Sequence, residues 1–220
     1  MKAMILAAGV GSRLDPLTRN TPKPLVPIVN QPNIEHIVHL LARHGFNEIM
    51  VNLHYLGGQI KKALGDGSGL GVRLTYAEED RLWGDAGSVK RAEDFFDDTF
   101  VVIGGDDISD FDLTRILSSH REKKALCTIA LSLVEDPSEY GIALVNERGR
   151  ITRFVEKPRG GSMFSNAANT GVYFLDPAVL ELIPKGVMYG LGKDLLPLLI
   201  ERKMRLYGCP LYTSPSPRDS

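Results

Sequence analysis

The chain has 220 residues, 43% of them hydrophobic and 24% charged, so it can bury a full core as one large domain or two small ones. Its formal net charge of −1 excludes a broad basic surface for nucleic acid, so any phosphate binding must be local. No apolar run reaches the ~18 residues of a membrane span, and the first residues lack the length and flanking charge of a signal peptide. We therefore expect a cytoplasmic protein with neither nucleic acid nor a membrane as a partner.

The start of the chain predicts a buried strand that delivers a loop. An apolar run over residues 3–8 is closed by Gly9 and Gly11, as expected where a strand of an open α/β sheet ends at a ligand site. Because glycines allow positive φ and close approach, their N–H groups and the Ser12 hydroxyl could line an anion site. Arg13 adds a planar fork of donors suited to phosphate oxygens.

A lysine follows this loop on a stiff segment. Lys23 stands between Pro22 and Pro24, which restrict the backbone on either side, so its ammonium could stabilise charge in a transition state.

Two common nucleotide-binding glycine motifs do not fit the loop that contains Gly9 and Gly11. The chain has no Walker string, and Leu14 stands where the dinucleotide fingerprint needs a third glycine. By itself, the Gly-x-Gly pattern is explained better by an ordinary turn.

Strand and helix patterns then alternate. We expect helices over 34–41, 57–64 and 86–95, and strands over 48–52, 72–77 and 100–104. This alternation favours a three-layer α/β fold, with a mostly parallel twisted sheet and helices on both faces, in a Rossmann-like arrangement.

The second half predicts a different arrangement. We expect a strand over 126–134, a hairpin over 142–145 and 151–155, helices beginning at 176 and 193, and a strand over 204–207. Cys127 and Cys209 have neither metal-ligand spacing nor a disulfide framework, so buried thiols are expected. Residues 213–220 are polar and proline-rich, and we interpret them as a disordered or non-native tail after a single domain over 1–212.

An acidic pair follows the strand over 100–104. Asp106 and Asp107 would lie at the carboxyl end of a central strand, where a hard oxygen ligand can hold Mg²⁺ against phosphates. Aspartate is also a common turn residue after a strand, and that alternative stays open. Asp112 is expected to cap the helix that carries Leu113.

The longer string from Gly9 to Thr18, followed by Pro22-Lys23-Pro24-Leu25, resembles the signature of the sugar-1-phosphate nucleotidylyltransferases, also called nucleotide-sugar pyrophosphorylases. The resemblance continues in order along the chain and is nearest to mannose-1-phosphate guanylyltransferases. It implies that Arg13, Lys23 and Asp106 are catalytic, with Asp106 as the Mg²⁺ ligand. It implies a nucleotide site of Leu6, Ala8, Gly9, Gly11, Ser12, Arg13, Glu78, Glu79, Gly84 and Asp85. For the sugar phosphate it implies Gly141, Glu156, Lys157, Asn169 and Thr170.

The chemistry of the side chains before the turn at Gly84 and Asp85 limits which nucleotide base we expect. An ionised carboxylate only accepts hydrogen bonds, and guanine presents two adjacent donors, so Glu78 or Glu79 favours guanine over uracil or thymine. A solvated acidic turn is about as consistent with these residues. Asp85 replaces the threonine that the family usually carries in this turn.

The resemblance implies transfer of a nucleotidyl group from a nucleoside triphosphate to a sugar-1-phosphate, with GTP and mannose-1-phosphate giving GDP-mannose. The alternatives are a uridylyl- or thymidylyltransferase and a non-catalytic nucleotide-sugar-binding regulatory protein. The family's Trp-x-Asp-x-Gly segment, which carries a second metal aspartate, is absent after residue 207. Whether the protein forms a homo-oligomer stays open.

Overall fold

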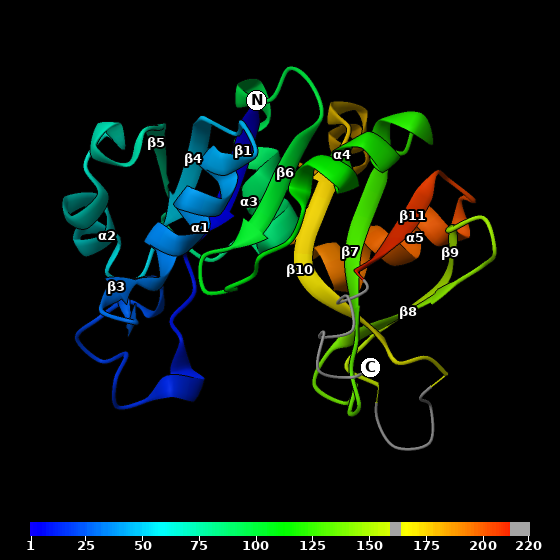
Figure 1. Ribbon diagram of the computed structural model, residues 1–220, viewed down its shortest axis with the longest axis horizontal. Helices are drawn as coiled ribbons and strands as arrows, with labels where there is room; N and C mark the ends of the chain where they lie inside the picture. The colour runs from blue at the N-terminus through cyan, green and yellow to red at the C-terminus, as the bar shows by residue number, and fades with distance from the viewer. Residues whose placement is uncertain (159–163, 212–220) are drawn as a thin grey trace, which may run out of the picture.

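A computed structural model describes residues 1–158 and 164–211, and for Arg13 only the backbone. The expected tail over 213–220 lies outside the described residues. The centre is a nine-stranded sheet whose main path runs β11-β7-β10-β6-β1-β4-β5 (Figure 1). Four of the six pairings along this path are parallel, so the expected α/β fold with a mostly parallel sheet is confirmed.

The first half of the chain forms the parallel part of the sheet. The strand β1 (Lys2–Leu6) lies between β4 (Glu48–Leu53) and β6 (Phe100–Gly104), and β4 pairs in parallel with β5 (Arg73–Glu78). Because these strands are parallel, their carboxyl ends meet at one edge of the sheet. The glycine loop after β1, the base turn (residues 79–88) after β5 and the acidic pair Asp106 and Asp107 after β6 all begin at that edge.

The second half is joined to the first by a strand that the sequence did not predict. β10 (Ala167–Leu175) lies antiparallel between β6 and β7 (Cys127–Leu133), with a break in register between Asn169 and Tyr173. β11 (Leu206–Leu211) pairs in parallel with β7. The predicted hairpin is confirmed as β8 (Gly141–Val145) and β9 (Ile151–Glu156), and β8 joins the sheet through β10.

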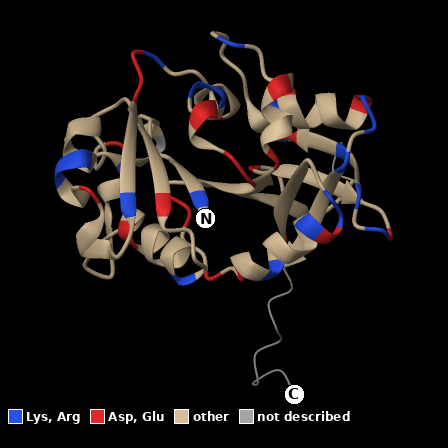
Figure 2. Ribbon diagram, turned by 90° about the horizontal axis from the view of Figure 1, so that it is seen from above, with Lys and Arg blue, Asp and Glu red and all other residues tan. Residues whose placement is uncertain are grey.

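Helices cover both faces of the sheet. One face is covered by α1 (Asn33–Arg43), α2 (Gly57–Leu64) and α4 (Leu113–Glu122), and the other by α3 (Asp85–Arg91) and α5 (Leu196–Glu201). Successive residues of a strand point to opposite faces, so Ala3 and Ile5 join one hydrophobic core while Met4 joins the other. Figure 2 shows the charged residues mainly on helices and loops, with the strands largely uncharged.

Most element predictions agree with the structure. The helix over 57–64 and the strand over 100–104 have the expected bounds, and Asp112 caps α4 by accepting a hydrogen bond from the Arg115 N–H at 3.0 Å. Cys127 and Cys209 are free and buried, as expected. A two-stranded hairpin, β2 (Pro27–Ile28) with β3 (Gln31–Pro32), precedes α1.

Three helix predictions need correction. The helix expected over 86–95 ends at Arg91, because the following residues close tight turns, with Phe95 and Phe96 donating to the carbonyls three residues back. The helix at 176 is a 3₁₀ helix, Pro177–Leu182, capped by Asp176. The helix at 193 starts earlier, as a wide π turn over Leu191–Leu195 that leads into α5. No helix among the described residues is long and apolar enough to cross a membrane.

Candidate active site

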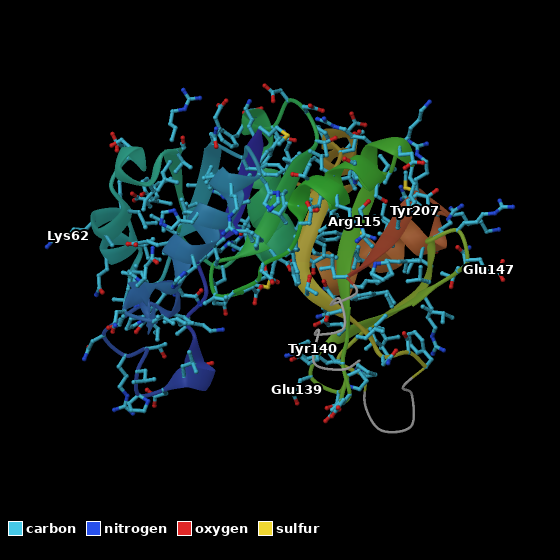
Figure 3. All side chains as sticks on the ribbon, viewed as in Figure 1. Lys62, Arg115, Glu139, Tyr140, Glu147 and Tyr207 are labelled. Carbon is cyan, nitrogen blue, oxygen red and sulfur yellow. The ribbon has the colours of Figure 1, made fainter. Side chains whose placement is uncertain are left out.

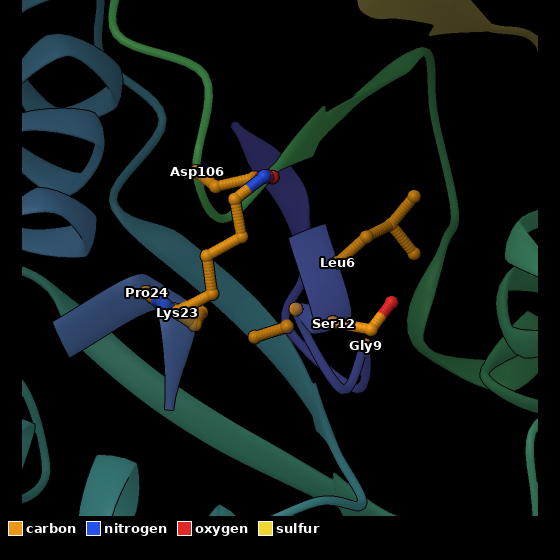
Figure 4. Close-up of a pocket in the computed structure, with 8 residues that line it drawn as sticks. Leu6, Gly9, Ser12, Lys23, Pro24 and Asp106 are labelled. Carbon is orange, nitrogen blue, oxygen red and sulfur yellow. The ribbon is translucent and has the colours of Figure 1, made fainter. Parts of the chain in front are cut away.

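Two adjoining pockets open at the carboxyl edge of the parallel strands. The lysine pocket has a cavity volume of about 240 Å³ and is lined by Leu6, Ala7, Gly9, Gly11, Ser12, Lys23, Pro24 and Asp106 (Figure 4). The glutamate pocket is lined by Leu6, Ala8, Gly9, Asn52, Glu79, Leu82, Trp83, Gly84, Asp85, Ser88, Gly104 and Asp106. Three residues, Leu6, Gly9 and Asp106, belong to both, so the two pockets form one cleft.

The glycine loop is held closely against the lysine segment. Gly11 has a φ of 71°, and a β-carbon there would lie 2.9 Å from the Lys23 β-carbon and 3.1 Å from a Thr18 methyl group. The Thr18 hydroxyl also donates to the Gly11 carbonyl oxygen at 2.9 Å. Only glycine fits this position without strain. The side chain of Arg13 lies outside the described residues, so its predicted role stays a prediction.

Two residues of the predicted catalytic set, 83 positions apart in the sequence, meet in the lysine pocket. The Lys23 ammonium forms an ion pair with the Asp106 carboxylate, and both side chains are partly buried. Figure 4 shows the Lys23 side chain extended across the pocket to Asp106. Asn33, on α1, supports this arrangement by donating from Nδ2 to the Asp106 carbonyl oxygen at 3.0 Å.

A second carboxylate lies behind Asp106. The Asp107 side chain occupies the space between two glycines, since β-carbons added at Gly104 and Gly171 would come within 2.3 Å and 2.5 Å of its Oδ2. Burial raises the pKa of Asp107, and the nearby Lys23 charge lowers it in part. Lys23 therefore interacts with two acids, Asp106 in the lysine pocket and Asp107, which is not among the residues lining either pocket.

The structure distinguishes Glu79 from Glu78. Glu79 is 8% exposed and lines the glutamate pocket, where its Oε1 accepts from Asn52 Nδ2 at 3.0 Å and its buried Oε2 has no partner among the described residues. Asn52 in turn accepts from the Ala7 N–H at 2.7 Å, which ties Glu79 to the glycine loop. Glu78 is exposed, pairs with Lys61 at 3.0 Å and is not among the residues that line the pocket, so its nucleotide contact stays a prediction that the geometry favours less than that of Glu79.

Asp85 connects the base turn to the loop over residues 189–191. Its Oδ1 accepts from the Ala86 N–H at 2.8 Å and from the Leu191 N–H at 2.5 Å. Burial raises the pKa of Asp85, while these backbone bonds lower it. Tyr189 strengthens the connection, because its N–H donates to the Trp83 carbonyl at 2.9 Å.

The residues predicted for the sugar phosphate gather beside this loop. The Glu156 carboxylate lies between two glycines, since β-carbons at Gly141 and Gly192 would come 2.7 Å and 2.6 Å from its Oε2. Burial raises the pKa of Glu156, the Lys157 charge lowers it, and the Asp85 charge raises it. Glu156 on the sugar side and Asp85 on the base side are therefore close enough to interact electrostatically.

The remaining sugar-side predictions separate into two groups. Asn169 is held in place by two bonds: its Nδ2 donates to the Tyr173 hydroxyl at 2.5 Å, and its Oδ1 accepts from the Gly171 N–H at 3.0 Å. Lys157 has an unusual φ of 45° directly after β9, and its backbone N–H donates to the Tyr140 carbonyl at 3.1 Å. Thr170 differs from both, because its hydroxyl donates at 2.9 Å to the carbonyl oxygen of Ala130 within the sheet.

Sequence reasoning missed Asn33, Asn52 and the packing role of Asp107. Asn52 carried a signal, since it is a polar residue inside an otherwise apolar strand and is 2% exposed. Asn33 carried none, because an asparagine at the start of a helix is ordinary.

A glycine loop and an acid–ammonium pair, placed at the carboxyl ends of parallel strands, define a nucleotide-binding α/β protein. The model of the nucleotidyl transferase family matches residues 2–212, and the chain belongs to this family of enzymes, the sugar-1-phosphate nucleotidylyltransferases.

Relatives with different substrates in their names are similar to the chain. A UTP–glucose-1-phosphate uridylyltransferase of Synechocystis sp. is 41% identical, and the alignment covers 94% of this chain and 57% of the relative. A mannose-1-phosphate guanylyltransferase catalytic subunit beta of Drosophila pseudoobscura pseudoobscura is 35% identical, covering 96% and 57%. The chain thus spans little more than half the length of these relatives. A Bacillus anthracis protein, assigned as a glucose-1-phosphate thymidylyltransferase, has a crystal structure that superposes with a TM-score of 0.85 at 32% identity, covering 96% of this chain and 87% of that one.

Proposed function

We propose that the protein transfers a nucleotidyl group from a nucleoside triphosphate to a sugar-1-phosphate. A phosphate oxygen of the sugar-1-phosphate attacks the α-phosphorus, the bond from that phosphorus to the bridging oxygen breaks, and pyrophosphate leaves. The observation that carries this proposal is the single cleft in which Asp106 and Gly9 line both pockets. A nucleoside triphosphate could then place its phosphates in the lysine pocket and its base in the glutamate pocket.

The chain's own residues would act by position and charge. The loop N–H groups and the Ser12 hydroxyl would bind phosphate oxygens, and Lys23 would neutralise charge on the reacting phosphates as it exchanges Asp106 for them. On the acceptor side, Glu156 and Asn169 would bind sugar hydroxyls and Lys157 the incoming phosphate.

Members of this family typically use a divalent metal, and the residues fit Mg²⁺ in one way. No cluster of three or more His, Cys, Asp or Glu side chains exists in the described parts of the chain. Mg²⁺ is commonly held by one or two carboxylates together with substrate phosphates, and Asp106 offers such a carboxylate on the wall shared by both pockets. The ion would neutralise phosphate charge when bound.

We further propose that the base is guanine and the sugar phosphate mannose-1-phosphate. The support is Glu79, which lines the glutamate pocket and whose buried Oε2 accepts no hydrogen bond from the described residues. Guanine can donate both N1–H and N2–H to a carboxylate, whereas uracil has a single N3–H flanked by acceptor carbonyls. A base that leaves the buried carboxylate partly unpaired should lose ~10²-fold or more in discrimination.

The test is pyrophosphate release with Mg²⁺, using GTP, UTP, dTTP and ATP against mannose-, glucose- and N-acetylglucosamine-1-phosphate. We expect GTP with mannose-1-phosphate to give the highest kcat/KM. Glu79→Gln should reduce the preference for GTP, while Glu78→Gln, at the exposed neighbour, should leave it unchanged. The same preference in both variants would remove Glu79 from base selection.

Two outcomes would favour other functions. Preference for UTP or dTTP would overturn the guanine proposal but keep the reaction class, and the 41% identity to a uridylyltransferase makes UTP with glucose-1-phosphate the second candidate. Binding of triphosphate and sugar phosphate without turnover would overturn the enzymatic proposal and indicate a regulatory protein.

A further inference from the structure

A third cavity lies outside the candidate active site, between α4, the β8–β9 turn and β11. This basic pocket has a volume of about 660 Å³, and its polar wall includes Arg115, Ser119, Lys123, Glu147, Arg148 and the thiol of Cys209. It shares no residue with the lysine or glutamate pocket. In Figure 3, Arg115, Tyr207 and Glu147 lie at the end of the molecule opposite Lys62.

The pocket concentrates positive charge on a chain that is slightly acidic overall. Three cations and one carboxylate line it, which gives a formal charge of +2 against a net charge of −1 for the whole chain. None of Arg115, Lys123 and Arg148 forms an ion pair with another described residue. Like charges that outnumber the counter-charges around them repel one another, and an anion between them would relieve that repulsion.

Lys123 lies close to both the β8–β9 turn and β11. Its Nζ lies 5.2 Å from the centre of the Tyr207 ring, and a β-carbon at Gly149 would come 2.9 Å from the same nitrogen. Gly149 has a φ of 75°, so the turn approaches the ammonium with a residue that leaves room for it. The ammonium therefore lies between the turn and the Tyr207 ring.

The β8–β9 turn is also rigidly built. Asn146 Oδ1 accepts from the N–H groups of Arg148 and Arg150, each at 3.0 Å, and the Gly208 N–H donates to the Gly149 carbonyl at 2.9 Å. These bonds order the turn and anchor it to β11. A backbone that is ordered in advance lowers the entropy lost when a ligand binds.

We propose that the basic pocket binds a phosphate dianion, either inorganic phosphate or the phosphate group of a small ester. Two guanidinium groups offer paired donors that match phosphate oxygens, Lys123 adds a point charge, and the Ser119 hydroxyl adds a neutral donor. The volume falls within the range of small-molecule sites, so an ester can be accommodated beside its phosphate.

The test is a titration followed by ¹⁵N-labelled amide spectra of the chain, with inorganic phosphate in one arm and glycerol-3-phosphate in the other. The Gly149 and Gly208 signals report the basic pocket, and the Gly9 and Gly11 signals report the active site separately. We expect both ligands to shift the Gly149 and Gly208 signals at saturation. Tighter binding in one arm identifies the source of the phosphate.

A charge-neutralising pair of variants measures the contribution of the cations. Arg115→Gln combined with Lys123→Gln should weaken phosphate binding at Gly149 at least tenfold, whereas the matched control Lys62→Gln, on the exposed surface of α2, should change it less than twofold. Equal affinities in the two proteins, or no shift at Gly149 and Gly208, would overturn the proposal.

An independent measurement needs no change in charge. Cys209 is 9% exposed and lines the basic pocket, while Cys127 is fully buried, so a neutral maleimide should label Cys209 selectively. Saturating phosphate should slow this labelling several-fold, and Cys209→Ser should abolish it. Labelling at the same rate with and without phosphate would contradict a ligand in the pocket.

Discussion

The buried histidine of α4 should make the stability of the protein sensitive to acid. His120 is 2% exposed, its Nδ1 lies 2.9 Å from the Thr128 hydroxyl oxygen on β7, and its buried Nε2 has no partner among the described residues. Burial lowers the pKa of His120 from 6.5 to about 4, with Asp176 raising it and Arg121 lowering it. The folded protein therefore keeps this ring neutral at pH values where the unfolded chain protonates it.

The sign and size follow from proton linkage. Between pH 6.5 and about 4 the unfolded chain binds more protons at His120 than the folded protein, so the free energy of unfolding falls as the pH falls through this window. Between about pH 7.5 and 4.5 this one group should remove roughly 2.5 kcal/mol. That is a large share of the ~5–15 kcal/mol that stabilises a typical domain.

The assay is urea unfolding at several pH values for the natural chain and for a His120→Leu, Thr128→Val double variant. Replacing both partners avoids leaving the buried Thr128 hydroxyl without one. The variant should lose roughly 2 kcal/mol less stability on acidification, because the other titrating groups are common to both proteins. His39→Gln, at an exposed position of α1, should leave the pH dependence unchanged. Parallel pH profiles for the natural chain and the double variant would refute the reasoning.

Four further substitutions test the cleft. Lys23→Ala should lower the rate of pyrophosphate release by orders of magnitude without changing the melting temperature, and an unchanged rate would exclude Lys23 from the mechanism. Asp106→Asn should abolish Mg²⁺-dependent turnover, so activity at ordinary Mg²⁺ would contradict its assignment as the ligand. Asp85→Ala removes the acceptor for two backbone N–H groups, so it should raise the KM of both substrates and lower the free energy of unfolding in urea by ~1–2 kcal/mol. Unchanged KM values would limit Asp85 to a structural role. Gly171→Ala, at a φ of 79°, places a β-carbon 2.5 Å from the Asp107 carboxylate and should cost about 1–3 kcal/mol of stability, and a variant as stable as the natural chain would show that this loop adapts.

The sequence predicted the parallel half of the fold well because its signals are local. The strand over 100–104 is fully apolar, and the helix over 57–64 ends at the conformationally free Gly65. β10 has no such signal. Asn169, Thr170 and Gly171 interrupt its apolar alternation, and its register breaks at the same place. A strand that bends to place polar residues in a site cannot also show a clean period of two.

Some of the residues that line the cleft could be named from the sequence, but their contacts could not. Motif order suggested both Lys23 and Asp106, yet only the structure pairs them, since they come from segments 83 residues apart. The choice between Glu78 and Glu79 depended on where the strand ends, because Glu78 is the last residue of β5 and is exposed, whereas Glu79 directly after the strand is buried. The basic pocket gave no sequence signal, because its cations lie on α4 and on a distant hairpin turn.

The antiparallel β10 also constrains the order in which the chain can fold during synthesis. β6 can pair with β1 once both have been synthesised, but its other edge stays without its partner until β10, which follows α4, β7 and the β8–β9 hairpin in the chain. Val101, Val102 and Ile103 are fully buried in the finished sheet, so the nascent chain carries an unpaired apolar edge throughout that interval. Nascent chains stalled before residue 167 should therefore depend on chaperones to stay unaggregated, and those stalled after β10 has emerged should lose that dependence.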